Sequence, residues 1–161
     1  MKYFILGIMC ILSQSVLALD VFNIQSGDLC EDIEGKRWVC HNNVDTYVTG
    51  QSRCMFNKQI EPCTWYGFEF DYRSYDKTVP LRCSLTFTYP IQFGNPNNLE
   101  GKSDTKKFEL FLEENEGRFF NPQYMLLPRY GKALVVEHAI KCTYKDAPVF
   151  ESFRRFHLPK T

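Results

Sequence analysis

The cysteines are the strongest constraint on how this chain can fold. The sequence contains seven of them, and the first, Cys10, lies in an apolar leader. An even number of cysteines beyond such a leader is typical of an exported, disulfide-bonded domain, because oxidising compartments favour disulfides over free thiols. The six remaining cysteines are Cys30, Cys40, Cys54, Cys63, Cys83 and Cys142.

Residues 1–18 have the organisation of a cleavable signal peptide. Lys2 supplies a positive charge, an apolar stretch follows it, and Val16–Ala18 offers short side chains where a signal peptidase cleaves. The apolar stretch is too short for a permanent transmembrane helix. We therefore expect a single domain over residues 19–161 that is secreted or periplasmic and has no permanent membrane anchor.

Loop length suggests how the six cysteines pair. Many pairings are open to six cysteines, and sequence alone does not select one securely. Short local loops favour Cys30–Cys40 and Cys54–Cys63, which leaves Cys83–Cys142. No Cys-x-x-Cys pair is present and no histidine has zinc-finger spacing from a cysteine pair, so neither a metal nor another cofactor is expected.

Alternation of apolar and polar residues dominates the chain. It is clearest in Leu81–Tyr89 and in Lys132–Lys145, where every second residue is apolar, as in a strand with one buried face. Cys83 and Cys142 fall on these apolar faces, which favours a bond between neighbouring strands or across two sheets. Further strands are expected at Asp20–Gln25, Arg37–Val44, Thr46–Thr49, Tyr66–Tyr72, Phe108–Glu113, Arg118–Phe120 and Val149–Leu158.

Short alternating strands with cysteines on their apolar faces predict an all-β fold. We expect an antiparallel β-sandwich fastened by disulfides, with a closed β-barrel as the alternative. The plan resembles an immunoglobulin-like sandwich in general outline. It departs from the immunoglobulin pattern because no tryptophan lies between Cys83 and Cys142.

Histidines are the candidates for acid–base chemistry. The chain has three, His41, His138 and His157. His138 is the most informative, since it shares the apolar face of its strand, where it is either a core residue or the base of a small secreted hydrolase working with a carboxylate. No serine-hydrolase elbow or metalloprotease motif supports the enzymatic alternative.

Aromatic side chains and one polar loop are the candidates for binding. Exposed rings can stack on sugars or anchor a protein interface, although aromatic residues in strands more often fill the core. The loop Gly94–Lys106 carries amide side chains on a β scaffold, a common place for a binding site. The binding candidates are Trp38, Trp65, Tyr66, Tyr72, Tyr75, Asn97 and Asn98.

The charge balance narrows the classes of partner. The chain has 19 basic and 19 acidic residues, and removal of Lys2 with the leader leaves 18 against 19. This balance argues against general nucleic-acid binding. We expect a non-catalytic binding or interaction module of the cell envelope or extracellular space, with a protein or a glycan as partner. The alternatives are an inhibitor or immunity-type protein that blocks another protein, and the small hydrolase that uses His138.

Overall fold

The described part of the chain consists of β-strands. The computed structural model describes residues 19–94, 101–127 and 133–160, which form ten strands and no helix. None of these residues therefore belongs to a helix able to span a lipid bilayer. The expected signal peptide, residues 1–18, lies outside the described residues. The strands are β1 (Leu19–Glu31), β2 (Arg37–Asn42), β3 (Asp45–Tyr47), β4 (Ser52–Phe56), β5 (Gln59–Ser74), β6 (Val79–Gly94), β7 (Gly101–Leu112), β8 (Glu116–Leu126), β9 (Leu134–Tyr144) and β10 (Ala147–Leu158).

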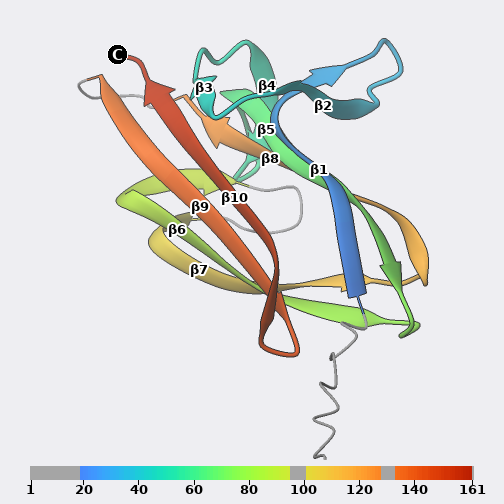
Figure 1. Cartoon of the computed structure of the whole chain (residues 1–161). Helices are drawn as coiled ribbons and strands as arrows, with labels where there is room; N and C mark the ends of the chain where they lie inside the picture. The colour runs from blue at the N-terminus through green and yellow to red at the C-terminus, as the bar shows by residue number, and fades with distance from the viewer. Residues whose placement is uncertain (1–18, 95–100, 128–132, 161) are drawn as a thin grey trace, which may run out of the picture.

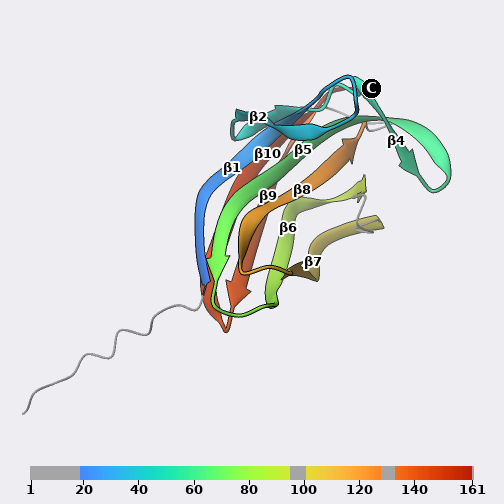
Figure 2. The same cartoon turned by 90° about the vertical axis from the view of Figure 1, so that its right-hand side faces the viewer.

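The strands form two layers that enclose one core (Figure 1). One layer has the order β2-β1-β5-β8, with β4 on the far end of β5, and the other has the order β7-β6-β9-β10-β3. Among the described residues, strand pairing joins the two layers at one place, where Phe93 and Gly94 of β6 pair with Met125 and Tyr124 of β8. Figure 2 shows how the long strands bend around the core. The β-sandwich predicted from the alternation is confirmed.

Alternation places one face of each long strand inside. Tyr66, Phe68, Phe70 and Tyr72 of β5 are all buried. The same holds for alternate residues of β6 from Val79 to Phe87 and of β9 from Val136 to Tyr144. The ring of Phe68 stacks on that of Phe150 from the opposite layer, with 4.6 Å between centroids. Offset contacts of this kind between aromatic rings stabilise a core beyond the area they bury.

The three disulfides are Cys30–Cys40, Cys54–Cys63 and Cys83–Cys142, the same pairs that loop length suggested. Each bond joins neighbouring strands of one layer: β1 to β2, β4 to β5 and β6 to β9. Cys83 and Cys142 lie directly opposite each other in the ladder, with 4.1 Å between their Cα atoms. None of the three therefore links the two layers, unlike the inter-sheet bridge of antibody domains.

A polar seam closes the sandwich between β1, β3 and β10. It is built around Arg154, whose side chain is only 1% exposed. The guanidinium donates hydrogen bonds to Thr46 Oγ1 (2.7 Å) and Ser26 Oγ (2.9 Å), and it lies 3.8 Å from Asp28 Oδ1. Ser152 of β10 and Ser26 of β1 also bond to each other at 2.7 Å. The seam gives a buried cation a set of partners, without which its burial would be costly.

Candidate functional site

His138 is part of the core. Its imidazole is buried among the rings of Tyr66, Phe87 and Phe156, and its Nε2 has no hydrogen-bond partner. Burial, with a smaller contribution from the positive charge of Arg154, lowers the pKa of His138 from 6.5 to about 3. The charged group that acts on it is thus a cation. This arrangement does not supply the pair of histidine and carboxylate that the hydrolase alternative requires.

The structure separates the aromatic candidates. Tyr66 and Tyr72 lie in the core, so their assignment to a binding surface is corrected: they share the inward face of β5. Tyr75 is 76% exposed in the connection between β5 and β6, at the opposite end of β5 from Trp65. Trp38 is 40% exposed on β2. The five rings therefore do not form one surface.

Trp65 is held in a small cluster on the outer side of β5. The guanidinium of Arg37 lies 3.9 Å from the centre of its ring, and Tyr124 meets the ring edge-on at 5.2 Å. The same cluster contains the Cys54–Cys63 bridge and Leu126. Because Arg37 covers the ring, Trp65 supports the β4–β5 hairpin and offers little free surface. Asn97 and Asn98, the candidates from the polar loop, lie outside the described residues.

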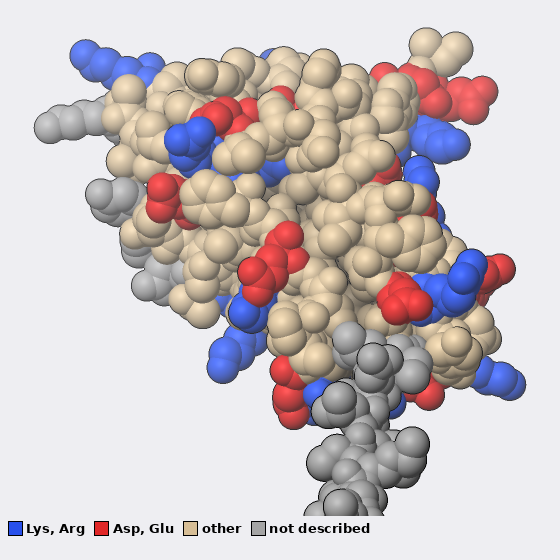
Figure 3. All heavy atoms as spheres, in the orientation of Figure 1, with Lys and Arg blue, Asp and Glu red and all other residues tan. Residues whose placement is uncertain are grey.

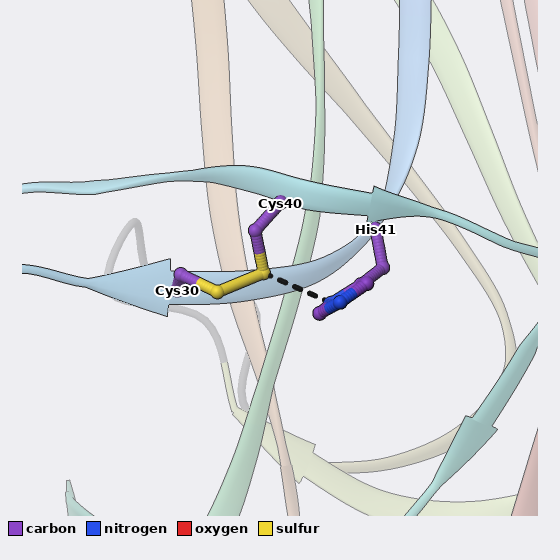
Figure 4. A group of neighbouring side chains, drawn as sticks. All are labelled: Cys30, Cys40 and His41. Atoms are coloured by element: carbon purple, nitrogen blue, oxygen red, sulfur yellow. Dashed lines mark hydrogen bonds between the residues drawn. A yellow bond between two sulfur atoms is a disulfide. The ribbon is translucent and has the colours of Figure 1, made fainter.

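A possible metal-ligand group involves Cys30, Cys40 and His41, whose ligand atoms lie within 4.8 Å of one another (Figure 4). The two cysteines form a disulfide, and it is the thiolate that binds a metal. In this oxidised state, His41 is the one member of the group that offers a good ligand atom. The group therefore does not make a metal centre.

The described residues form a shallow groove on the outer face of β6, β9 and β10, which sequence reasoning missed. Its volume is about 450 Å³. We call it the outer groove and define it by the outward side chains Ser84, Thr86, Ala139, Lys141, Glu151 and Phe153.

Strand register explains the shape of the outer groove. Thr86, Ala139 and Phe153 lie side by side across the three strands, and Ser84, Lys141 and Glu151 form the next row. Ala139 is small, so the neighbouring Phe153 ring stays 47% exposed. Lys141 Nζ bonds to Glu151 Oε1 at 2.7 Å in the second row. The groove thus combines one apolar ring with hydroxyls and a closed ion pair.

A cluster of charged residues lies beside the outer groove, on the same outer face of β10 and on the neighbouring strand β3. Asp45 lies 2.6 Å from His157 Nε2 and 2.8 Å from an Arg155 nitrogen, while the ring of Tyr47 stacks on His157 at 4.6 Å. The hydrogen bond from His157 and the pairing with Arg155 lower the pKa of the Asp45 carboxyl, against the opposing effect of burial. The cluster fastens β3 to β10 and leaves Tyr47 largely exposed.

Acidic and basic side chains are mixed on the molecular surface. Figure 3 shows both signs interspersed over one face, without a large patch of either among the described residues there. This distribution agrees with the balanced composition of the sequence. On this face, the described residues form no continuous basic track of the kind that binds a phosphate backbone.

Comparisons with known proteins bear on the fold alone. No protein-family model matches the sequence, and no curated protein matches it either. Among solved structures, the chain is similar to an immunoglobulin-like protein from Pseudomonas aeruginosa, with a TM-score of 0.51 over 89% of this chain and 99% of that one. The two sequences are 11% identical. The chain thus has an immunoglobulin-like β-sandwich fold, and its three disulfides indicate an oxidising location, extracellular or periplasmic.

Proposed function

We propose that this chain is an exported, non-catalytic module that binds a protein through the outer groove. The observation that carries the proposal is Phe153, a half-exposed ring in a concave part of a sheet face. Protein interfaces concentrate their binding energy in a few large residues, often aromatic, that a ring of polar groups shields from water. Phe153 supplies such an anchor.

The surroundings of the ring favour a protein over a sugar. Lys141 and Glu151 already bond to each other at 2.7 Å, so they form a satisfied rim rather than a set of free donors and acceptors for hydroxyls. The floor consists of the small side chains Ser84, Thr86 and Ala139, which leave room for an apolar side chain beside Phe153. An apolar centre with a polar rim is the usual anatomy of a protein interface.

The rigidity of the scaffold supports the same function. The outer groove spans three paired strands, two of which are joined by the Cys83–Cys142 bond directly beneath the row of Ser84 and Lys141. A site on fixed strands loses little conformational freedom when a partner binds, which favours affinity. The three disulfides support an oxidising location for this surface, as an exported module requires.

A photo-crosslinking amino acid at position 86 tests the proposal in the native source. We expect it to capture one protein partner, which is then purified and titrated with the chain by calorimetry. Phe153→Ala should weaken this binding by about 30-fold, the effect of losing a central anchor. Thr86→Arg, which fills the groove, should weaken it at least as much.

Phe111→Ala is the matched control. Phe111 is 53% exposed on β7 of the same layer but does not line the outer groove. Its loss should leave the affinity unchanged. Equal effects of Phe153→Ala and Phe111→Ala would refute the groove as the binding site. Binding of a glycan that depends on Phe153 would refute the protein as the partner.

A further inference from the structure

The disulfide between β1 and β2 has a titratable group in contact with one of its sulfurs. His41 Nδ1 lies 3.2 Å from Cys40 Sγ, as the dashed line in Figure 4 shows. Cys30 and Cys40 are both half-buried and His41 is exposed. The bridge is therefore partly accessible to a reagent in solution, and the imidazole beside it is exposed to solvent.

A β-bulge creates this contact. Leu29 pairs with Val39 and Asp28 pairs with His41, so Cys40 is an extra residue on β2 without a partner of its own on β1. In a regular strand, adjacent side chains point to opposite faces. A bulge interrupts that alternation and can turn two consecutive side chains toward each other. The approach of imidazole to sulfur is thus built into the backbone.

We propose that Cys30–Cys40 is an exchangeable disulfide, which an external dithiol reduces selectively with His41 as the proton donor. A thiolate of the dithiol bonds to Cys30 Sγ, and the bond between the two cysteines breaks. Its electron pair stays on Cys40 Sγ, which takes the Nδ1 proton of the His41 imidazolium. The Asp28 carbonyl oxygen, 3.5 Å from Cys40 Sγ, is placed to accept a hydrogen bond from the new thiol.

A second exchange completes the reaction. The other thiolate of the dithiol attacks its own sulfur in the mixed disulfide and displaces Cys30 as a thiolate, which is then protonated by solvent. The dithiol is oxidised to a disulfide and the protein bridge is reduced by the same two electrons. Donation of a proton to the leaving Cys40 sulfur makes Cys30 the preferred point of attack, because a better leaving group leaves faster.

Two ion pairs involve charged residues of the strands that carry this bridge. Glu31 of β1 lies 2.5 Å from Arg37 of β2, and Asp28 of β1 faces Arg154 of β10 across 3.8 Å. His41 is the titratable side chain in contact with the bridge among those the structure describes. The pH dependence of exchange should therefore follow this imidazole, together with the ionisation of the attacking thiol.

The protein contains its own control for this inference. Cys54–Cys63 also joins neighbouring strands and has nearly the same sequence separation, 9 against 10. Both of its cysteines are buried, and Trp65 and Leu126 pack against them. Cys83 and Cys142 are buried in the main core. Access and the imidazole thus distinguish Cys30–Cys40 from both other bridges.

The test measures reduction of each bridge in the folded, fully oxidised protein. Limiting dithiothreitol is added at pH 6, aliquots are alkylated at intervals, and peptide mass spectrometry reads each cysteine. We expect Cys30–Cys40 to be reduced at least about tenfold faster than the other two bridges. Equal rates for Cys30–Cys40 and Cys54–Cys63 would overturn the proposal.

The role of His41 is tested by substitution and by pH. His41→Gln should slow reduction of Cys30–Cys40 about fivefold or more at pH 6 and much less at pH 8.5, because histidine side chains donate protons chiefly at the lower pH. Added imidazole buffer should restore part of the rate at pH 6. His157→Gln, which removes a different surface imidazole, should change nothing. A slowing shared by all three bridges, or one that is the same at both pH values, would contradict the assignment.

A monothiol shows which sulfur is attacked. With glutathione and rapid alkylation, the glutathione adduct should form on Cys30 and the alkyl group on Cys40. The opposite distribution, or an equal one, would refute His41 as the donor to the leaving sulfur.

Discussion

Replacing His138 with phenylalanine should remove most of the pH dependence of stability between pH 7.5 and pH 5. The imidazole is enclosed by the rings of Phe87 and Phe156, which lie 4.8 and 5.4 Å away between ring centroids. Its burial, with Arg154 nearby, lowers the pKa of His138 to about 3. Phenylalanine has a similar shape and cannot take up a proton.

The size of the effect follows from the difference in pKa between the two states. A histidine in the unfolded chain titrates near pH 6.5, whereas His138 in the folded protein stays neutral down to about pH 3. In this window the unfolded state binds more protons, so the free energy of unfolding falls as the pH falls. The contribution of the neutral imidazole to the free energy of unfolding is fully present above pH 6.5, and about 2 kcal/mol is lost by pH 5.

Urea denaturation followed by tryptophan fluorescence at pH 7.5, 6 and 5 measures this loss. The free energy of unfolding of His138→Phe should exceed that of the parent by a margin that grows by about 2 kcal/mol from pH 7.5 to pH 5. His138→Leu serves as a second variant if the phenylalanine ring does not fit. Parallel pH profiles for the parent and both His138 variants would show that the imidazole takes up its proton in the folded state.

Three further sets of substitutions test the close packing of β1, the polar seam and the longest disulfide loop by the same denaturation experiment. Gly27→Ala should lower the free energy of unfolding by at least about 3 kcal/mol, because its Cβ would lie 1.6 Å from a backbone oxygen of β2. Gly117→Ala, whose Cβ meets only a side chain at 3.3 Å, should lower it far less. Equal losses would contradict this packing. Arg154→Ala should lower the free energy of unfolding by about 3–5 kcal/mol, because it leaves the polar seam without its cation, and Arg154→Lys should lower it less. An alanine variant as stable as the parent would refute a structural role for the seam. Replacing both Cys83 and Cys142 with alanine should lower the free energy of unfolding by about 4 kcal/mol, because their bond closes the longest loop, with a sequence separation of 59. Loss of either short bridge should lower it less. A smaller loss for the long bridge than for the short ones would contradict the loop-entropy argument.

Strand positions were predictable wherever one face is apolar and the other polar. The alternation in Leu81–Tyr89 and Lys132–Lys145 located the centres of β6 and β9 and placed Cys83 and Cys142 on the inner faces that they occupy. The ends were less predictable, because β6 runs on to Gly94 beyond its alternating part. Backbone pairing with neighbouring strands sets those ends, and the pairing is not visible in a single segment.

The β4–β5 hairpin was missed because its turn lacks the usual sequence signal. Asn57 and Lys58 have φ angles of 48° and 64°, as the two-residue hairpin turn with positive φ at both positions requires. Asn-Gly and Asp-Gly are the dipeptides typical of that turn, and with lysine in place of glycine at the second position the turn cannot be recognised from the sequence. Lys145 and Asp146 make the same turn between β9 and β10.

The candidate site was less predictable than the fold. Tyr66 and Tyr72 were grouped with other aromatic residues by closeness in sequence, although their own alternation with Gly67 and Asp71 pointed them inward. Phe153 was missed because its exposure depends on the size of Ala139 on the neighbouring strand. Such a cross-strand neighbour becomes known only with the register.

The order of the disulfide bonds along the chain has a consequence for folding. Each bond joins a cysteine to the next cysteine in sequence, so no bond spans another. A chain that enters an oxidising compartment N-terminus first exposes its cysteines in this same order. An oxidase that joins each newly exposed cysteine to the preceding free one would therefore produce the native pairs directly, without a slow step of disulfide rearrangement.

Folding of this domain cannot finish before strand β10 is available for pairing. β10 pairs with β9 and with β3, and its Arg154 fills the polar seam, so neither the second layer nor the seam is complete before residues 147–158 arrive. The two local hairpin bridges, in contrast, need only residues up to Cys63. Oxidation of these hairpins can thus precede folding of the domain, so the disulfides and the non-covalent packing of this protein can form at different times.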